Sequence, residues 1–432
     1  MKNEELKNVR GSIDFGGKDA IIRSFISKTL QETFEKYGYN PLETSILCYY
    51  DLLALKYDED NDILKEIYKV TDQGKRNLAL RYDLTVPFAK YIASNPNIKL
   101  PFKRYEIGKV FRDGPIKKGR AREFVQCDVD SVGIEGQMIE AELISIFVEG
   151  YSKLGIDIIV KYNNRKLMNG IIEVCNVEKE KISQVITVID KIEKLSKDEL
   201  ILEFKKQGLQ EKQIDDLLKY LNMSLEELSN IFAENNNQNL KEGLAELNEL
   251  NQYIKELNLT KYVKFVSSLA RGQEYYTGTV FEVYTADGSI KSSIGGGGRY
   301  DRIIGDFIND GKKYPAVGIS FGLDVIFEIL KEKQMNFNNI DLYIIPMNNK
   351  VLALKIANEL RKNKINVEID MNDFKLKKAL GIVNEKNIPV VIILGDDEIN
   401  QNKIAIKDMK NKTQVLENMD GYVNKVKEII KI

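Results

Sequence analysis

Residues 102–133 read FKRYEIGKVFRDGPIKKGRAREFVQCDVDSVG and have the pattern of two strands joined by a loop. The second half alternates, with Phe124, Gln126, Asp128 and Asp130 on one side and Val125, Cys127, Val129 and Ser131 on the other. Successive side chains of a strand point to opposite faces of its sheet, so this alternation predicts a strand. We therefore expect an antiparallel sheet built around a long hairpin.

The flanking sequence extends this sheet and adds helices. Residues 63–133 are expected to form short strands and turns, and strands resume over 278–294. Apolar residues at helical spacing predict a helix over 18–37, and further helices are expected over 136–153 and around 322–333. The region thus has the pattern of an α+β domain, an antiparallel sheet flanked by helices.

Two further regions differ in character from this domain. Residues 178–258 are rich in Glu, Lys, Leu and Asn with helical periodicity, which predicts a helical insertion. After the linker KQMNFNNID at 333–341, strands such as DLYIIP and PVVIILG alternate with helices. This alternation predicts a small α/β domain with a largely parallel sheet and a last helix from 421.

Composition excludes several classes of protein and mechanism. The 432 residues carry a net charge of -1, three widely spaced cysteines and no histidine. No CxxC pair indicates a zinc site, and without histidine neither a Ser-His-Asp triad nor an HExxH site can exist. The N-terminus does not have the pattern of a signal peptide, and no apolar run approaches the ~18 residues of a membrane helix. We expect a soluble, cytoplasmic protein without a membrane partner.

Candidate binding residues lie in the predicted sheet. The loop FRDGPIKKGR begins with Arg112 next to the strand, and guanidinium groups bind phosphate oxygens in bidentate fashion; a solvated hairpin tip is the alternative. Gln126 and Asp130 share a strand face, and Asp83 and Thr85 in LRYDLT, two residues apart, are expected to share one as well. Such acidic walls suit a small amine-bearing ligand, although each residue alone could face solvent.

Two unusual segments accompany these residues. In LARGQEYYTGTVFEVY, residues 269–284, Arg271 precedes two tyrosines. Adjacent tyrosines on a strand point to opposite faces, so at most one would line a given pocket. In SSIGGGGRYD, residues 292–301, four consecutive glycines weaken a sheet unless a ligand or another backbone must approach closely. A flexible linker is the alternative explanation.

In this order, the motifs resemble those of histidyl-tRNA synthetase, a family of class II aminoacyl-tRNA synthetases, over nearly the whole chain. GYNPLETSIL at 38–47 is similar to class II motif 1, residues 102–133 to motif 2, and PAVGISFGLDVI at 315–326 to motif 3. Residues 269–284 and 292–301 resemble the two signature peptides of the histidine enzymes. The resemblance implies a class II catalytic domain over 1–330 with a helical insertion at about 165–262. It also implies an anticodon-binding α/β domain over 340–432.

The resemblance also implies an activity, ligands and residue roles. The family joins L-histidine to tRNA(His) through a histidyl-adenylate, uses ATP with Mg²⁺ as substrate, and acts as a homodimer. It needs no tightly bound metal. Arg271 and Arg112 correspond to the catalytic arginines that flank the α-phosphate. The histidine-binding positions are Asp83, Thr85, Gln126, Asp130, Arg271, Tyr275 and Tyr276, and the ATP-binding positions are Arg112, Arg120 and Phe124.

One departure leaves two functions open. Val325 stands where motif 3 of the family has an arginine that stacks on adenine. Either Arg120 or Arg302 compensates, or ATP binding is weak. The alternative to a synthetase is a catalytically weakened paralogue that senses histidine, like the regulatory subunit of ATP phosphoribosyltransferase. That regulatory family typically lacks the anticodon domain and the signature peptides, and this chain has counterparts of both.

Overall fold

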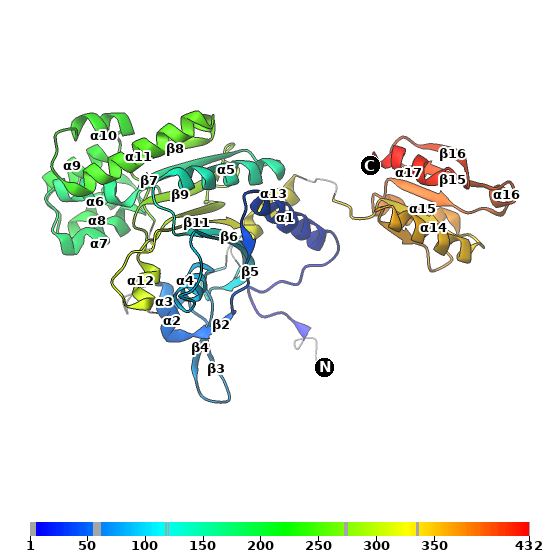
Figure 1. Cartoon of the computed structure of the whole chain (residues 1–432), viewed down its shortest axis with the longest axis horizontal. Coiled ribbons are helices and arrows are strands. Elements are labelled where there is room, and N and C mark those ends of the chain that lie inside the picture. Colours follow the sequence, from blue (N-terminus) through cyan, green and yellow to red (C-terminus); the bar gives the residue numbers. More distant parts are fainter. Residues whose placement is uncertain are drawn as a thin grey trace. The chain divides into compact units, whose positions relative to one another are not determined.

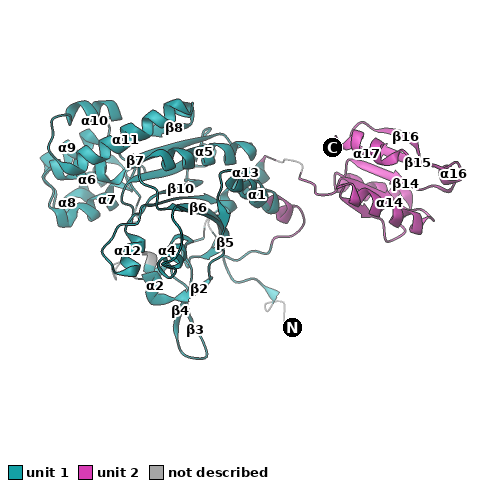
Figure 2. Cartoon of the chain, viewed as in Figure 1, with its two compact units in different colours: residues 1–14, 23–332 teal, residues 15–22, 333–432 magenta. Residues whose placement is uncertain are grey.

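The computed structural model describes residues 6–54, 62–116, 119, 121–271, 275–333 and 337–431. The chain divides into two compact units (Figure 2). Unit 1 comprises Met1–Asp14 and Arg23–Glu332, and unit 2 comprises Phe15–Ile22 and Lys333–Ile432. Each unit has a sheet of its own.

The centre of unit 1 is a sheet to which the described residues contribute eight strands. Their order is β1 (Asn40–Pro41), β5 (Phe102–Phe111), β6 (Glu123–Val132), β11 (Ala316–Gly322), β10 (Gly295–Arg299), β9 (Thr279–Thr285), β7 (Ile158–Asn164) and β8 (Val263–Phe265). Only the outer pairs, β1 with β5 and β7 with β8, are parallel. The expected antiparallel sheet is confirmed, and the long hairpin at 102–133 provides its β5 and β6.

Helices pack against one face of this sheet (Figure 1), and the contacts between them include aromatic side chains. Helices α1 (Gly17–Lys36), α5 (Met138–Lys153) and α13 (Leu323–Glu332) lie where the periodicity predicts them. Phe34 of α1 and Phe147 of α5 lie 5.6 and 5.0 Å, between ring centroids, from Phe321 of β11. All three rings are fully buried. Since strand residues alternate, the neighbours of Phe321 on β11 point to the opposite face, where the site lies.

The segment before β5 is more helical than the sequence predicts. The described residues place a small sheet of β2 (Leu47–Tyr49), β4 (Asn77–Leu80) and β3 (Lys69–Thr71) beside the helices α2 (Tyr50–Ala54), α3 (Asp62–Lys65) and α4 (Thr85–Ala93). The expectation that Asp83 and Thr85 share a strand face is wrong. Strand β4 ends at Leu80, and the Asp83 carboxylate accepts a hydrogen bond of 2.9 Å from the Val86 backbone amide in the first turn of α4.

The expected helical insertion lies between β7 and β8. Its helices are α6 (Arg165–Val174), α7 (Ile182–Ile189), α8 (Lys197–Lys206), α9 (Glu211–Tyr220), α10 (Leu225–Ile231) and α11 (Gln238–Glu256), drawn in green in Figure 1. Capping boxes at Ser196 and Ser224 begin α8 and α10. Helices α6 and α11 approach closely at Gly170 and Gly243, where an added Cβ would overlap the facing backbone.

Unit 2 is an α/β domain with a mixed sheet. Its described strands follow the order β13 (Val367–Ile369), β12 (Leu342–Ile345), β14 (Val390–Ile393), β15 (Lys403–Asp408) and β16 (Thr413–Asn418). The first three are parallel, and β15 and β16 form an antiparallel hairpin that was not expected. The helices are α14 (Lys350–Lys362), α15 (Leu376–Glu385), α16 (Asp396–Asn400) and α17 (Tyr422–Ile430).

Replacing one glycine of β10 tests how tightly the central sheet is packed. A Cβ on Gly297 would overlap the Gly318 carbonyl oxygen and lie 2.7 Å from Ile319 Cα. We expect Gly297→Ala to lower the free energy of unfolding of unit 1 by about 1–3 kcal/mol or more, the usual cost of overpacking. The matched control is Gly322→Ala on β11, whose Cβ would be no closer than 3.4 Å to its neighbours. Urea unfolding followed by circular dichroism measures both, and equal stabilities would contradict the packing argument.

Candidate active site

A cavity of about 210 Å³ opens over the polar face of the central sheet. It collects side chains from strand β6, from helices α4 and α13, and from the segment before β9. Its lining includes these predicted site residues: Asp83, Thr85, Arg112, Phe124, Gln126, Asp130, Arg271, Tyr275 and Tyr276. The remaining predicted residue, Arg120, lies outside the described residues. The fold thus brings together residues that are far apart in the chain. The most distant of these predicted residues, Asp83 and Tyr276, are separated by 193 positions.

Glycines form the floor of this cavity. The register aligns two rows across the sheet: Gly298, Gly318, Asp130 and Arg104 in one, and Gly296, Ser320, Asp128 and Glu106 in the other. A Cβ on Gly298 would lie 2.8 Å from the Tyr276 ring, and one on Gly296 would overlap the Arg271 guanidinium. The four-glycine run is therefore strand β10 and not a linker, and its missing side chains leave room for Arg271 and Tyr276.

Two guanidinium groups line the cavity. Arg271 Nη1 lies 3.3 Å from Glu282 Oε1, and the other oxygen of Glu282 accepts a 2.5 Å hydrogen bond from the Tyr284 hydroxyl. Arg112 donates from Nε to the Tyr82 carbonyl oxygen at 3.1 Å, and its guanidinium lies 5.1 Å from the Phe124 ring centroid. Each cation is held by the protein and still faces the cavity, the arrangement that binding of a polyanion needs.

Asp130 is buried and already neutralised. One oxygen lies 2.8 Å from Arg104 Nη2, and the other accepts a 2.5 Å hydrogen bond from the Tyr300 hydroxyl. All three side chains are buried, and burial raises the pKa of Asp130 and of Tyr300. The Arg104 guanidinium also lies 4.4 Å from the Phe88 ring centroid. Asp130 therefore faces the cavity as a hydrogen-bond acceptor, and Arg104 compensates its negative charge.

Asp128 belongs to the same cavity but is absent from the predicted site residues. It is 3% exposed, and its Oδ1 has no hydrogen-bond partner among the described residues. The pKa of Asp128 is raised to about 8, mainly by burial and then by the neighbouring Asp130, while Arg104 acts against the shift. The alternation of residues 124–130 places Asp128 between Gln126 and Asp130 on one face, so this signal was present in the sequence.

The expectation that at most one tyrosine lines the pocket is wrong. Tyr275 and Tyr276 precede β9, which begins only at Thr279, so strand alternation does not apply to them. Both line the cavity, with ring centroids 4.7 Å apart at 51°. Tyr275 also makes an edge contact with Tyr300, which bonds Asp130. The pair and Asp130 therefore form one wall.

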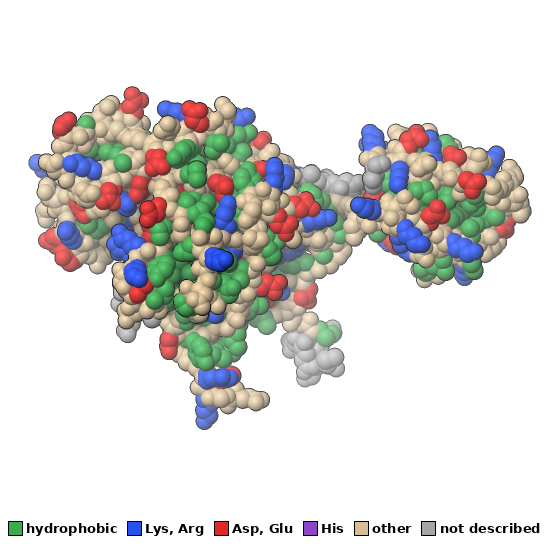
Figure 3. Space-filling model, viewed as in Figure 1, with side chains coloured by type: hydrophobic (Ala, Val, Ile, Leu, Met, Phe, Trp, Pro, Cys, Tyr) green, Lys and Arg blue, Asp and Glu red, His purple; other side chains and the backbone are tan. Residues whose placement is uncertain are grey.

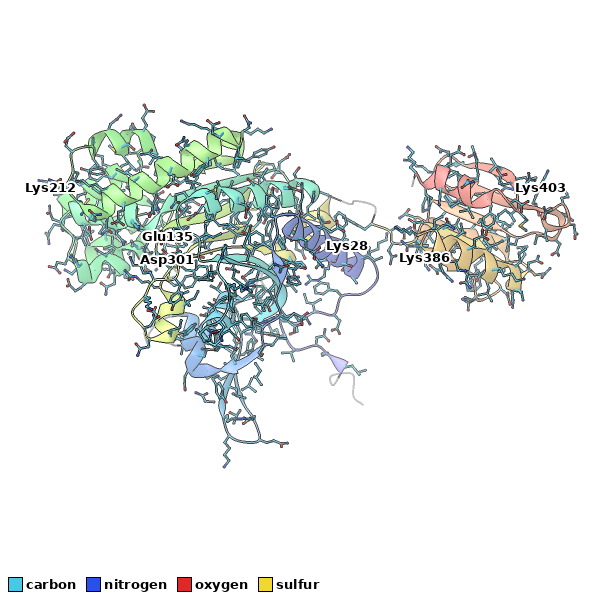
Figure 4. All side chains as sticks on the ribbon, viewed as in Figure 1. Lys28, Glu135, Lys212, Asp301, Lys386 and Lys403 are labelled. Carbon is cyan, nitrogen blue, oxygen red and sulfur yellow. The ribbon has the colours of Figure 1, made fainter. Side chains whose placement is uncertain are left out.

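Val325 lines the cavity from α13, with Asp324 beside it. Asp324 accepts from Arg23 at 2.7 Å and from the Val125 amide at 2.8 Å, which holds α13 against β6. Arg302, one of two cations expected to compensate for Val325, instead lines a second cavity of about 810 Å³ together with Asp301, which Figure 4 labels. Within the described residues, the cations that line the first cavity are Arg112 and Arg271.

Charged groups elsewhere on the surface are mixed in sign. Figure 3 shows lysines, arginines and carboxylates interspersed over the visible face of each unit, in keeping with the net charge of -1. Among the described residues, no group of three or more Cys, Asp or Glu side chains is placed to hold a metal ion. No described helix is both long and apolar enough to cross a membrane.

Comparison with known families identifies the architecture. A family model described as histidyl-tRNA synthetase matches residues 12–326, and one described as an anticodon binding domain matches residues 341–429. The chain belongs to the histidyl-tRNA synthetase family. It is 47% identical over 416 residues to histidine–tRNA ligase 1 of Bacillus cereus, covering 95% of each chain. It is 43% identical to histidine–tRNA ligase 2 of Shouchella clausii, covering 95% of this chain and 97% of that one.

Solved structures of the family share the fold. Histidyl-tRNA synthetase from Nostoc sp. PCC 7120 superposes with a TM-score of 0.87 at 27% identity, covering 98% of this chain and 99% of that one. A protein of Bacillus halodurans described as an ATP phosphoribosyltransferase regulatory subunit/histidyl-tRNA synthetase gives 0.73 at 20% identity, covering 87% and 96%. The second likeness concerns the fold alone. The predicted α+β fold with a separate C-terminal domain is confirmed.

The raised pKa of Asp128 predicts how stability depends on pH. Its folded value of about 8 exceeds the unfolded value of about 4, so the folded protein binds more protons between these limits. Stability should therefore fall as pH rises from about 4 to 8. We expect Asp128→Asn to flatten this decline and to be more stable than the wild type at pH 8 by about 1–3 kcal/mol.

The matched control for this measurement is Asp157→Asn, at an exposed position before β7. Urea unfolding at pH 5 and pH 8 compares the three proteins. A decline of equal steepness in the wild type and in Asp128→Asn would show that Asp128 does not titrate in this window.

Proposed function

We propose that this chain attaches L-histidine to tRNA(His) in two steps, through a histidyl-adenylate made from ATP. The observation that carries this proposal is the cavity in which Arg271 and Arg112 meet the acidic residues of β6 and the Tyr275–Tyr276 pair. Membership of the histidyl-tRNA synthetase family, with relatives named histidine–tRNA ligase, supports it. The chain is in this view an aminoacyl-tRNA ligase.

In the first step, an oxygen of the histidine carboxylate attacks the α-phosphorus of ATP. A phosphorus–oxygen bond forms, the bond to the β-phosphate breaks, and pyrophosphate leaves with its Mg²⁺. Negative charge spreads over the phosphoryl oxygens in the transition state, and catalysis consists mainly of positioning and charge stabilisation. Arg271 and Arg112 are the groups we assign to this role. Glu282 orients Arg271 beforehand, and no histidine side chain is needed.

The wall opposite these cations suits an imidazole ring. We assign Tyr275, Tyr276 and Asp130 to the ring, and Asp83, Thr85 and Gln126 to the amino-acid main chain. A site that hydrogen-bonds both ring nitrogens rejects apolar isosteres strongly, because these leave buried polar groups unpaired. The contacts of Asp130 with Arg104 and Tyr300 support this, since they fix its carboxylate within the wall.

The adenine of ATP would lie against the apolar part of the lining. Phe124 and Val325 both line the cavity, so an apolar face is present where the family has an arginine. Arg112 lies over the Phe124 ring and would reach the phosphates from there. We propose Arg120 as a further phosphate ligand on the family resemblance alone.

The remaining assignments concern domains and partners. We propose a catalytic domain over 1–330 with an insertion at about 165–262, and an anticodon-binding domain over 340–432 that contacts tRNA(His). A homodimer in the cytoplasm is the proposed working form. Exposed apolar side chains near motif 1, on Ile46, Leu47 and Tyr49, support an interface there because they are 41%, 47% and 59% exposed.

Histidine-dependent exchange of pyrophosphate into ATP tests the proposal. We expect exchange with histidine and with none of the other nineteen amino acids. Arg271→Lys keeps a positive charge but loses the planar fork, and the rate should fall about 10²–10³-fold, as on loss of one transition-state donor. The control is Arg361→Lys in unit 2, which should leave exchange unchanged because this half-reaction needs no tRNA.

The alternative function predicts a different result in the same assay. A regulatory paralogue would bind histidine in calorimetry and give no exchange at any ATP concentration. The substitution of Val325 for arginine is the feature that favours it. Exchange by the wild type, lost in Arg271→Lys, excludes it.

A further inference from the structure

We propose that Glu193 of the helical insertion is a positioning residue for adenylate formation. By pairing with Lys161, it keeps this lysine away from Glu282, the carboxylate that holds Arg271. This inference rests on the proposed function and adds to it a link between the insertion and the reaction centre. The link consists of side chains on β9 and β7, two outer strands of the central sheet.

The contacts that hold Arg271 are long. Its Nη1 lies 3.3 Å from Glu282 Oε1 and 3.4 Å from the Phe281 carbonyl oxygen. Hydrogen bonds between a cationic nitrogen and a carboxylate are usually about 2.7–2.9 Å long. The Tyr284 hydroxyl occupies the other Glu282 oxygen at 2.5 Å, so Oε1 is the atom that serves a cation. A second cation that reached this oxygen would therefore compete with Arg271.

The register puts such a cation directly across the sheet. Lys161 on β7 is the cross-strand partner of Glu282 on β9, so both side chains point to the same face. Opposite charges at such positions ordinarily attract each other. The Lys161 ammonium group lies instead 2.6 Å from Glu193 Oε1 and 4.3 Å from the Tyr284 ring centroid. Glu193 thus diverts Lys161 from its partner on the neighbouring strand.

Burial makes this competition unequal. Glu193 and Glu282 line the same cavity of about 520 Å³, and their side chains are 60% and 19% exposed. The Lys161 side chain is 21% exposed, so its ammonium group needs a partner nearby when Glu193 is lost. Asp190 is the third carboxylate in the described lining of this cavity. The register favours Glu282 over Asp190, because Glu282 lies directly across from Lys161.

These charges form a relay from the insertion to the reaction centre. With Glu193 in place, Lys161 stays away and Glu282 serves Arg271. When Glu193 is removed, or withdrawn by a movement of the insertion, Lys161 turns to Glu282 and Arg271 loses its anchor. Fewer molecules then carry the guanidinium group in the orientation that the α-phosphate needs, and the rate falls because positioning is a large part of catalysis.

A double substitution tests this competition. Histidine-dependent pyrophosphate exchange is measured on the full chain at saturating histidine and ATP. Glu193→Gln keeps the size of the side chain and removes its charge, and kcat should fall about 2–5-fold, the effect of one partly exposed ion pair. Glu193→Gln combined with Lys161→Met should return to the wild-type rate, because this lysine then no longer competes for Glu282. Lys161→Met alone should also match the wild type.

The matched control replaces another lysine of the same cavity. Lys291 lines this cavity from the segment between β9 and β10, where it is exposed and outside the strand register with Glu282. Lys291→Met removes the same charge as Lys161→Met does. The double variant Glu193→Gln with Lys291→Met should therefore stay as slow as Glu193→Gln.

The outcomes are distinct. Restoration by Lys161→Met and not by Lys291→Met supports the proposal, since a purely structural role of Glu193 would not be rescued by removing a second side chain. An unchanged rate in Glu193→Gln would overturn it. A lowered rate that Lys161→Met does not restore would overturn it as well, because Glu193 would then act independently of this lysine. A wild-type protein without exchange would instead refute the proposed function on which the inference depends.

Discussion

The buried charges of β5 and β6 are the constraint on which the site depends. Arg104 lies fully buried between Glu106 at 3.6 Å and Asp130 at 2.8 Å, and Arg81 pairs with Glu106 at 2.6 Å. Charges so deep in a protein are tolerated only with partners, since removing one partner leaves an uncompensated charge. The hairpin register therefore matters for more than packing. A slip of one residue would turn every one of these groups into the aromatic layer on the other face.

On the next strands, β11 and β10, glycines occupy positions in the same rows as these charged residues. Because β10 and β11 present Gly296 and Gly318 to the cavity, large polar side chains lie directly against the sheet. The helical face is filled by aromatic rings, so the sheet is apolar on one side and charged on the other. This division explains how a chain without histidine can build a reaction centre. In the proposed mechanism, guanidinium groups supply the positive charge, and fixed geometry supplies the rest.

Much of this was predictable from the sequence because strand alternation and signature peptides are local signals. The face shared by Gln126 and Asp130 followed from a period of two. The placement of Thr85 in a helix did not follow from the sequence. The string LRYDLT has a strand-like pattern, which does not reveal that the Asp83 carboxylate accepts a hydrogen bond at the start of a helix. The tyrosine pair was misjudged because strand β9 begins only at Thr279. The hairpin at 403–418 was missed because its outer strand β16 is largely exposed and carries a weak apolar pattern.

The unliganded site is a compromise between stability and binding. Asp128 and Asp130 stand two residues apart on one strand; burial, and after it the neighbouring Asp130, raises the pKa of Asp128. In the proposed function, the ammonium group of histidine brings a positive charge into this acidic cavity, so part of the cost of building the site returns when substrate binds. Saturation at a hundred times Kd would stabilise the folded state by about 2.7 kcal/mol, comparable to the cost of one unpaired buried polar group.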